Sequence, residues 1–238
     1  MRSREFSCPV AVREVLLKGG SLLNRNKLST ILDMSAKTTK DILQKTKDAL
    51  KAAELGLDDV VKDDPNRKAS GLRNVVVFGR SITNILQNLR STEPAFDDWY
   101  RKYREEMEKD ELMRYMYELR SIILKEGELQ TSSSAHIRKL NTNDVSRFPR
   151  SPNAIGFFVG DRSGGSGWEV KMPDGSVERY YVDLPKETCI VNLNFRNAPK
   201  IHRGKDIEDN RVQHICSLYV TYLRDMVSDA YRVFGNKN

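Results

Sequence analysis

Apolar residues recur every three or four positions through the first half of the chain, which is the spacing of one face of an α-helix. The helices that this pattern predicts are residues 9–20, 28–61, 72–91, 91–110 and 111–127. Ser35 and Asp110 are suitable N-caps, and Gly127 is a suitable helix end. The polar stretch 62–71, around Pro65, is expected to be a loop. Helices joined by such short connections indicate an antiparallel bundle.

An aromatic stripe marks the fourth of these helices. Phe96, Trp99, Tyr103 and Met107 fall at positions i, i+3, i+7 and i+11, so they share one face. A stripe of this kind either fills a core or stacks against bases. We expect it to be part of the core of the bundle.

The second half of the chain has a different pattern. Residues 131–153 are polar and have no period, which indicates a surface connection. Strands are expected at 154–160, in a hairpin around Pro173-Asp174-Gly175 and at 188–195, and then a long amphipathic helix at 210–235. The fold class that follows is α+β, mainly α, with a small antiparallel sheet inserted before a C-terminal helix that packs back on the bundle. The expected division is 1–130, 131–207 and 208–235.

Composition narrows the class of protein. The 238 residues carry a net charge of +7, which fits either a polyanionic partner such as RNA or a basic surface without one. Three scattered cysteines and three histidines give neither a disulfide framework nor metal-ligand spacing, so we expect no metal and no cofactor. The first residues do not read as a signal peptide, and no apolar run is long enough to cross a membrane, so a cytoplasmic protein is expected.

Two loops concentrate positive charge. Residues 196–209 and 136–150 are expected to be loops whose basic side chains either grip phosphates without reading sequence or are simply solvated. The candidate nucleic-acid-binding residues in them are Arg196, Lys200, Arg203, Lys205, Arg138 and Lys139.

Arg120 lies inside the apolar arc of the helix 111–127, beside Met116 and Ile123. An arginine keeps its charge at any ordinary pH, so its burial requires a partner. Three interpretations remain open. The side chain reaches out to water over the core, it pairs with a carboxylate such as Glu93 or Asp97, or it faces a subunit interface or a site.

The stretch 96–127, "FDDWYRKYREEMEKDELMRYMYELRSIILKEG", resembles the HEPN superfamily of helical domains from prokaryotic conflict systems. The resemblance covers about 72–127 and rests on Arg120-Ser121 followed by Glu126-Gly127. It implies a homodimer and metal-independent RNA cleavage, in which an arginine steadies phosphate charge and a histidine moves protons. Here the histidine is absent.

Lys125 stands where the resemblance requires that histidine, and an exposed lysine is protonated at pH 7 and a poor base. We therefore expect a protein of a bacterial defence or stress system that binds RNA or a partner protein, with catalysis lost or weak. One alternative is an active ribonuclease, with Arg120 as phosphate anchor and Glu126, Lys125 or His136 as proton carrier. The other is a structural module whose sheet binds a partner.

Overall fold

The structure is a computed structural model that describes residues 38–62, 64–138, 145, 148–162, 164–185 and 189–235. The expected helix 9–20, the proposed cap Ser35 and the candidate Lys139 lie outside the described residues. Residues Thr39–Asn238 form one compact unit, and the divisions expected at 130 and 207 both fall inside it. No helix among the described residues is both long and apolar enough to cross a membrane.

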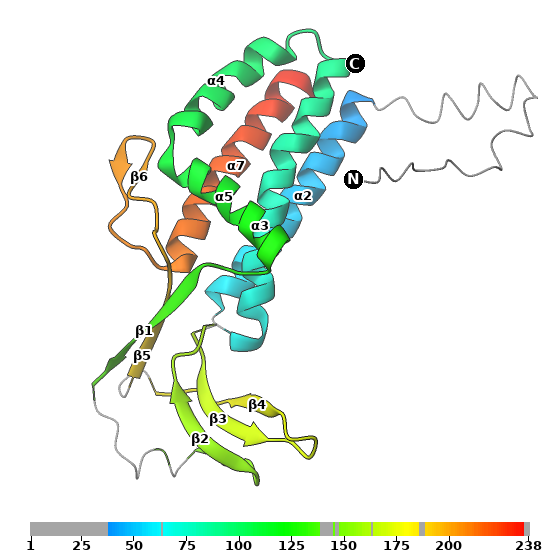
Figure 1. The fold of residues 1–238 in the computed structure, drawn as a ribbon. Helices are drawn as coiled ribbons and strands as arrows, with labels where there is room; N and C mark the ends of the chain where they lie inside the picture. The colour runs from blue at the N-terminus through cyan, green and yellow to red at the C-terminus, as the bar shows by residue number, and fades with distance from the viewer. Residues whose placement is uncertain are drawn as a thin grey trace, which may run out of the picture. The chain divides into compact units, whose positions relative to one another are not determined.

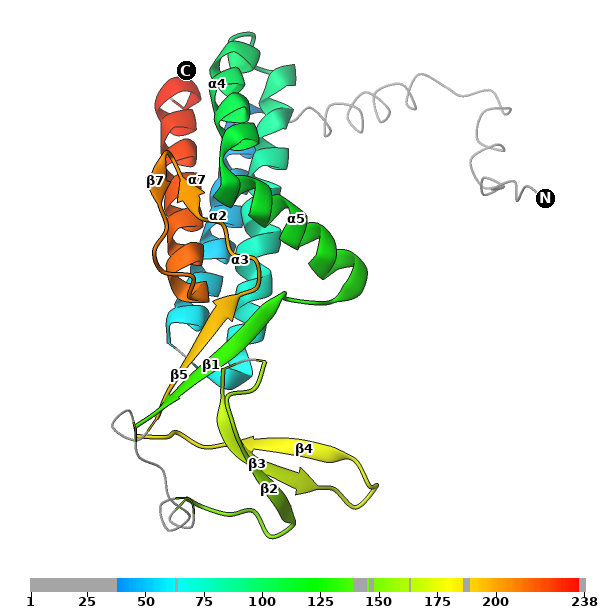
Figure 2. The same cartoon turned by 60° about the vertical axis from the view of Figure 1, so that its left-hand side comes forward.

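Helices dominate the described part of the chain, and the α+β, mainly α class is confirmed. The helices are α2 (Thr39–Val61), α3 (Pro65–Leu86), the 3₁₀ helix η2 (Gln87–Ser91), α4 (Phe96–Lys109), α5 (Glu111–Glu126) and α7 (Val212–Phe234). Figures 1 and 2 show α2, α3 and α7 running side by side, while α5 turns away from α4 and crosses α3. The C-terminal helix therefore completes the bundle.

Three small antiparallel sheets replace the one that the sequence predicts. They are β1 (Thr131–Ile137) with β5 (Cys189–Phe195), then β2 (Ala154–Val159) with β3 (Ser166–Lys171) and β4 (Val177–Tyr181), and finally β6 (Ile201–His202) with β7 (Lys205–Asp206). The predicted hairpin is confirmed between β3 and β4, where Gly175 has a φ of 87°. The loop expected at 196–209 contains the β6–β7 hairpin, whose turn holds Arg203 and Gly204 at positive φ.

The loop expected at 62–71 is wrong over most of its length, because α3 begins at Pro65. The side chain of Asp64 accepts a hydrogen bond from the backbone N–H of Asn66 and acts as the N-cap. Proline suits the first turn of a helix, since its missing N–H has no intrahelical partner there. The Asp-Pro pair was therefore a helix start and not a break.

The surface connection expected at 131–153 is wrong at its beginning. Thr131–Ile137 pairs along its whole length with Cys189–Phe195 as strand β1. Its sequence, "TSSSAHI", has little apolar alternation, and six of its seven residues are at least partly open to solvent. The strand depends on backbone hydrogen bonds to β5, which no local pattern reveals.

The aromatic stripe on α4 is confirmed as core. Phe96, Trp99 and Tyr103 are buried, and the rings of Phe96 and Trp99 pack against Phe234 near the end of α7. Asp229 of α7 adds a polar anchor at the same contact. Its carboxylate accepts hydrogen bonds from Trp99 Nε1 at 2.8 Å and from the Tyr103 hydroxyl at 2.7 Å. The helix α4 is thus held to α7.

Asp110 fixes the corner between α4 and α5. Its buried carboxylate accepts from the backbone N–H of Met113 at 3.0 Å, which caps α5, and from the backbone N–H of Arg203 at 2.7 Å. His202 Nδ1 lies 3.0 Å away. Burial alone would raise the pKa of this carboxyl, but the hydrogen bonds from His202, Arg203 and Met113 outweigh it and lower that pKa. One side chain therefore joins α4, α5 and the β6–β7 hairpin.

Replacing Asp110 with alanine should lower the free energy of unfolding by about 2–4 kcal/mol, because a helix cap and hydrogen bonds to a buried charge are lost together. Asp98→Ala is the matched control, since Asp98 is exposed and its ion pair within the described residues is with Arg101 on the same helix. That change should cost no more than about 0.5 kcal/mol. Urea unfolding at pH 7 measures both, and equal losses would contradict the role given to Asp110.

The contribution of Asp110 to the free energy of unfolding depends on pH. Because the folded-state pKa of Asp110 is lowered, its stabilisation is fully present above the ordinary value of about 3.9 and is lost as pH falls through the folded value. The difference in stability between the wild type and Asp110→Ala should therefore shrink in acid. A difference that stays constant from pH 7 to pH 3 would contradict this linkage.

Candidate functional site

Arg120 is half-buried on α5 and makes no hydrogen bond or ion pair with any described residue. The carboxylates named as possible partners are engaged elsewhere: Glu93 accepts from the Thr39 hydroxyl, and Asp97 pairs with Arg90. The interpretation that Arg120 pairs with one of them is therefore wrong. A side chain that reaches water over the core fits the observed half-burial.

The other candidate catalytic residues are not gathered around Arg120. Lys125 and Glu126 are exposed in the last turn of α5. His136 is exposed on β1, opposite Ile190 of β5. Among the described residues, no cluster of histidine, cysteine and carboxylate side chains is placed to hold a metal ion.

Arg203 is the most heavily engaged of the candidate phosphate-binding residues. Its guanidinium pairs with Glu106 at 2.9 Å and Asp225 at 3.4 Å, and it lies over the ring of Tyr222 at 4.6 Å. Together with His202 on Asp110, these contacts attach the hairpin to α4 and α7. The guanidinium of Arg203 is therefore occupied by contacts within the protein.

The remaining basic candidates are more open. Arg138, Lys200 and Lys205 are exposed, and the backbone N–H of Lys200 donates to the side chain of Glu111. Arg196 is also exposed, but it differs from these three because it belongs to a cleft.

That cleft, here called the arginine cleft, has a volume of about 440 Å³ and lies where α3, the end of α5, β1 and β5 meet. Arg73 of α3, Arg162 of the β2–β3 turn and Arg196 after β5 all line it, together with Glu126 and Glu128. All three arginines are exposed, and none forms an ion pair with a described residue. Arg73 donates to the backbone oxygen of Gly127, which leaves the other guanidinium N–H groups free for a ligand.

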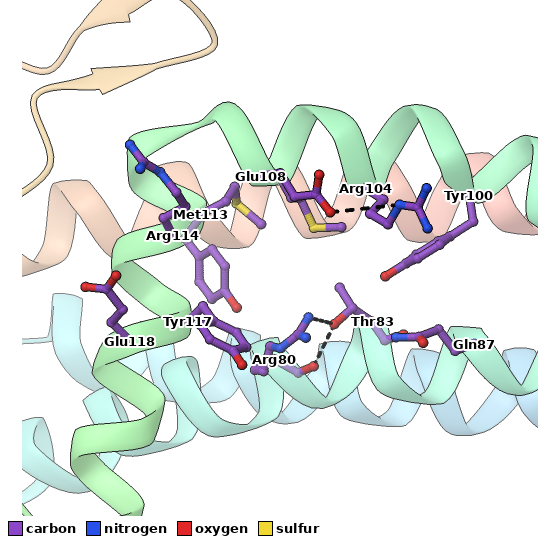
Figure 3. A pocket seen from close by; sticks show the side chains of 12 residues that line it. Arg80, Thr83, Gln87, Tyr100, Arg104, Glu108, Met113, Arg114, Tyr117 and Glu118 are labelled. Atoms are coloured by element: carbon purple, nitrogen blue, oxygen red, sulfur yellow. Dashed lines mark hydrogen bonds and ion pairs between the residues drawn. The ribbon is translucent and has the colours of Figure 1, made fainter.

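A second cleft, here called the tyrosine cleft, has a volume of about 510 Å³ and lies between α3, α4 and α5. Figure 3 shows Tyr100 and Arg104 of α4 facing Thr83 and Arg80 of α3, with Tyr117 of α5 at one end. Gln87, Glu108 and Tyr219 also contribute to its lining. The cleft exists because α4 is held to α7 and leaves this side of α3 open.

Arg80 is the central cation of the tyrosine cleft. It is half-buried, its guanidinium lies 5.0 Å from the ring centre of Tyr117, and it donates a hydrogen bond to the Thr83 hydroxyl. It forms no ion pair with a carboxylate of the described residues. A partly buried charge is stabilised by a counter-ion, so this position favours an anionic ligand.

Tyr219 of α7 is 2% exposed, yet it lines the tyrosine cleft. Among the described residues, the buried side-chain polar atom without a hydrogen-bond partner is Trp168 Nε1, so the Tyr219 hydroxyl does not count as a buried, unsatisfied group. Gly79 of α3 makes room for the ring, since a Cβ at this position would lie 2.5 Å from Tyr219 Cε1. The structure thus brings the Tyr219 side chain from α7 to the wall of the cleft.

Burial is the main cause of the raised pKa values of Tyr100 and Tyr219. The positive charge of Arg80 acts in the opposite direction and favours a lower pKa for both hydroxyls. Both hydroxyls remain protonated near neutral pH and are available as hydrogen-bond donors.

Comparison with known proteins gives a match to a family model. The family model described as "Bacteriophage lambda protein ea47" matches residues 59–153, which is less than half of the chain. No curated protein and no solved structure matches the chain. The resemblance to the HEPN superfamily is therefore wrong, because the stretch that carried it, 96–127, lies inside the region that the ea47 family matches.

Sequence reasoning did not find the tyrosine cleft. Arg80 sits between Gly79 and Ser81 in an apolar run, the same kind of signal that drew attention to Arg120. Which of the two arginines faces a cavity depends on the position of α4, and that position is set by residues distant in sequence.

Replacing Gly79 with alanine should destabilise the protein by about 1–3 kcal/mol, because the new methyl group collides with the Tyr219 ring. In an unobstructed helix the same change would stabilise by about 1 kcal/mol. Thermal unfolding measures the effect.

Tyr219→Ala provides the control background. There the added methyl group meets no ring, so Gly79→Ala should become neutral or stabilising. Additive effects of the two changes would contradict the contact between Gly79 and Tyr219.

Proposed function

We propose that this protein binds single-stranded nucleic acid and that the arginine cleft contacts the phosphate backbone. The observation that carries the proposal is the convergence of Arg73, Arg162 and Arg196 from three separate parts of the chain. None of the three pairs with a carboxylate of the described residues. Arginine binds phosphate through a planar fork of N–H donors, and such contacts supply most of the affinity of sequence-independent binding.

The position of the arginine cleft beside the tyrosine cleft supports a strand rather than an isolated anion. Arg73 and Arg80 are seven residues apart on α3, which places them on one face about 10 Å apart. Arg73 lines the first cleft and Arg80 the second. A basic groove with aromatic side chains along it is the usual arrangement for binding a single strand.

The net charge of the chain favours the same partner. The excess of seven positive charges attracts a polyanion over a distance comparable to the Debye length. Glu126 and Glu128 at the edge of the arginine cleft reduce this attraction locally. We therefore expect binding of moderate affinity with a strong dependence on salt.

The double variant Arg162→Gln/Arg196→Gln should weaken binding of a labelled 20-nucleotide single strand about tenfold or more. It should also lower the slope of log K against log salt by about 1.4, since each lost phosphate contact contributes about 0.7. Fluorescence anisotropy between 50 and 300 mM NaCl measures both quantities, with RNA and DNA in separate series.

The matched control is Lys47→Gln/Lys51→Gln, which removes the same charge from the exposed face of α2. It should change the affinity for the single strand by less than about threefold. Equal losses in the two double variants would show that only net charge matters and would contradict a site. No salt-sensitive binding in the wild type, together with capture of a protein partner, would favour the alternative in which the chain binds protein.

A further inference from the structure

We propose that the tyrosine cleft is a binding site for a nucleotide, that is, a base on a phosphorylated ribose. The ligand is either a free mononucleotide or the terminal nucleotide of a strand. This inference concerns a different cavity from the arginine cleft and holds whether or not the arginine cleft binds nucleic acid.

The phosphate of the ligand is assigned to Arg80 and Arg104. Arg80 is half-buried and lacks a carboxylate partner among the described residues, so an incoming anion would supply its missing counter-ion. Arg104 is exposed at the opening and has only a loose pair with Glu108, at 3.9 Å. Figure 3 shows these two arginines on opposite walls of the cleft. A phosphate between them would be held by two guanidinium groups.

The base is assigned to the tyrosine rings. Tyr100, Tyr117 and Tyr219 line one cavity from three different helices. Tyr117 is 54% exposed although it is a large aromatic side chain, and Arg80 already lies over its ring. An exposed ring with a fixed orientation is a ready stacking surface for a base.

Polar groups inside the cleft suit the edges of a base or a ribose. The side chains of Tyr219 and Gln87 line the cleft and carry a hydroxyl and an amide, whereas the Thr83 hydroxyl is already hydrogen-bonded to Arg80. The volume of about 510 Å³ is far larger than a phosphate ion needs and falls in the range of sites for small organic ligands. An inorganic anion alone would leave the rings and the hydroxyl without contacts.

Isothermal titration calorimetry of the full chain with AMP, CMP, GMP and UMP tests the proposal, with adenosine and inorganic phosphate as partial ligands. Each mononucleotide should bind more tightly than either partial ligand. Arg80→Gln should weaken AMP binding at least tenfold and leave adenosine nearly unchanged. Tyr117→Ala should weaken both about tenfold, the effect of losing one stacked ring. Tyr219→Phe should weaken both by a smaller factor.

Two variants serve as controls. Tyr180→Ala removes a tyrosine that is 50% exposed on β4, outside both clefts. Lys47→Gln removes a charge from α2. Neither should change AMP affinity more than twofold. A melting temperature measured for every variant confirms that it remains folded. Arg80→Gln should fold well, because Arg80 has no carboxylate partner within the described part of the chain.

A second series of titrations distinguishes a free mononucleotide from the terminal nucleotide of a strand. It uses single strands that carry or lack a 5′-phosphate. Binding of mononucleotides supports the free ligand, whereas a 5′-phosphate preference that Tyr117→Ala abolishes supports a strand end. If neither occurs, or if inorganic phosphate binds as tightly as AMP, the proposal is overturned. If mononucleotides bind as expected but Arg162→Gln/Arg196→Gln does not weaken the binding of a single strand, the arginine cleft loses its proposed role and the nucleotide site stands.

Discussion

The arrangement of helices around the tyrosine cleft depends on the hydrogen bonds of the buried Asp110 carboxylate. It caps α5, holds the backbone of Arg203 and contacts His202, so the bend between α4 and α5 is fixed from both sides. Asp229 then ties the other part of α4 to α7. With both ends of α4 held in this way, the side of α3 that carries Arg80 and Thr83 stays uncovered, and a cavity results.

Charge in this protein is divided between structural and available arginines. Arg203 has two carboxylates and a ring, and its role is to attach the β6–β7 hairpin. Arg80, Arg162 and Arg196 have no carboxylate partner in the described part of the chain, and all three line clefts. A cation left without a counter-ion in a concave site lowers its free energy by binding an anion, whereas one already paired gains little. Counting basic residues in a loop cannot make this distinction.

Much of the fold follows from the sequence, because helical spacing and the Pro-Asp-Gly hairpin are local signals. One error arose because the decisive contact is distant in sequence: β1 forms only because β5 pairs with it. The other arose because Pro65 was taken as the sign of a loop, whereas Asp64 and Pro65 begin the helix α3. The tyrosine cleft was not predicted from the sequence. Arg120 was singled out as a cation in an apolar arc, but Arg80 fits that description too, and only the packing of α4 on α7 decides which one borders a cavity.

The most direct test of this account is a crystal structure of the full chain with AMP. We predict that the phosphate lies within hydrogen-bonding distance of the Arg80 guanidinium and that the base stacks on a tyrosine ring of the cleft. An empty cleft at saturating AMP, with Arg80 paired to a carboxylate of this chain or of a second copy, would contradict the account.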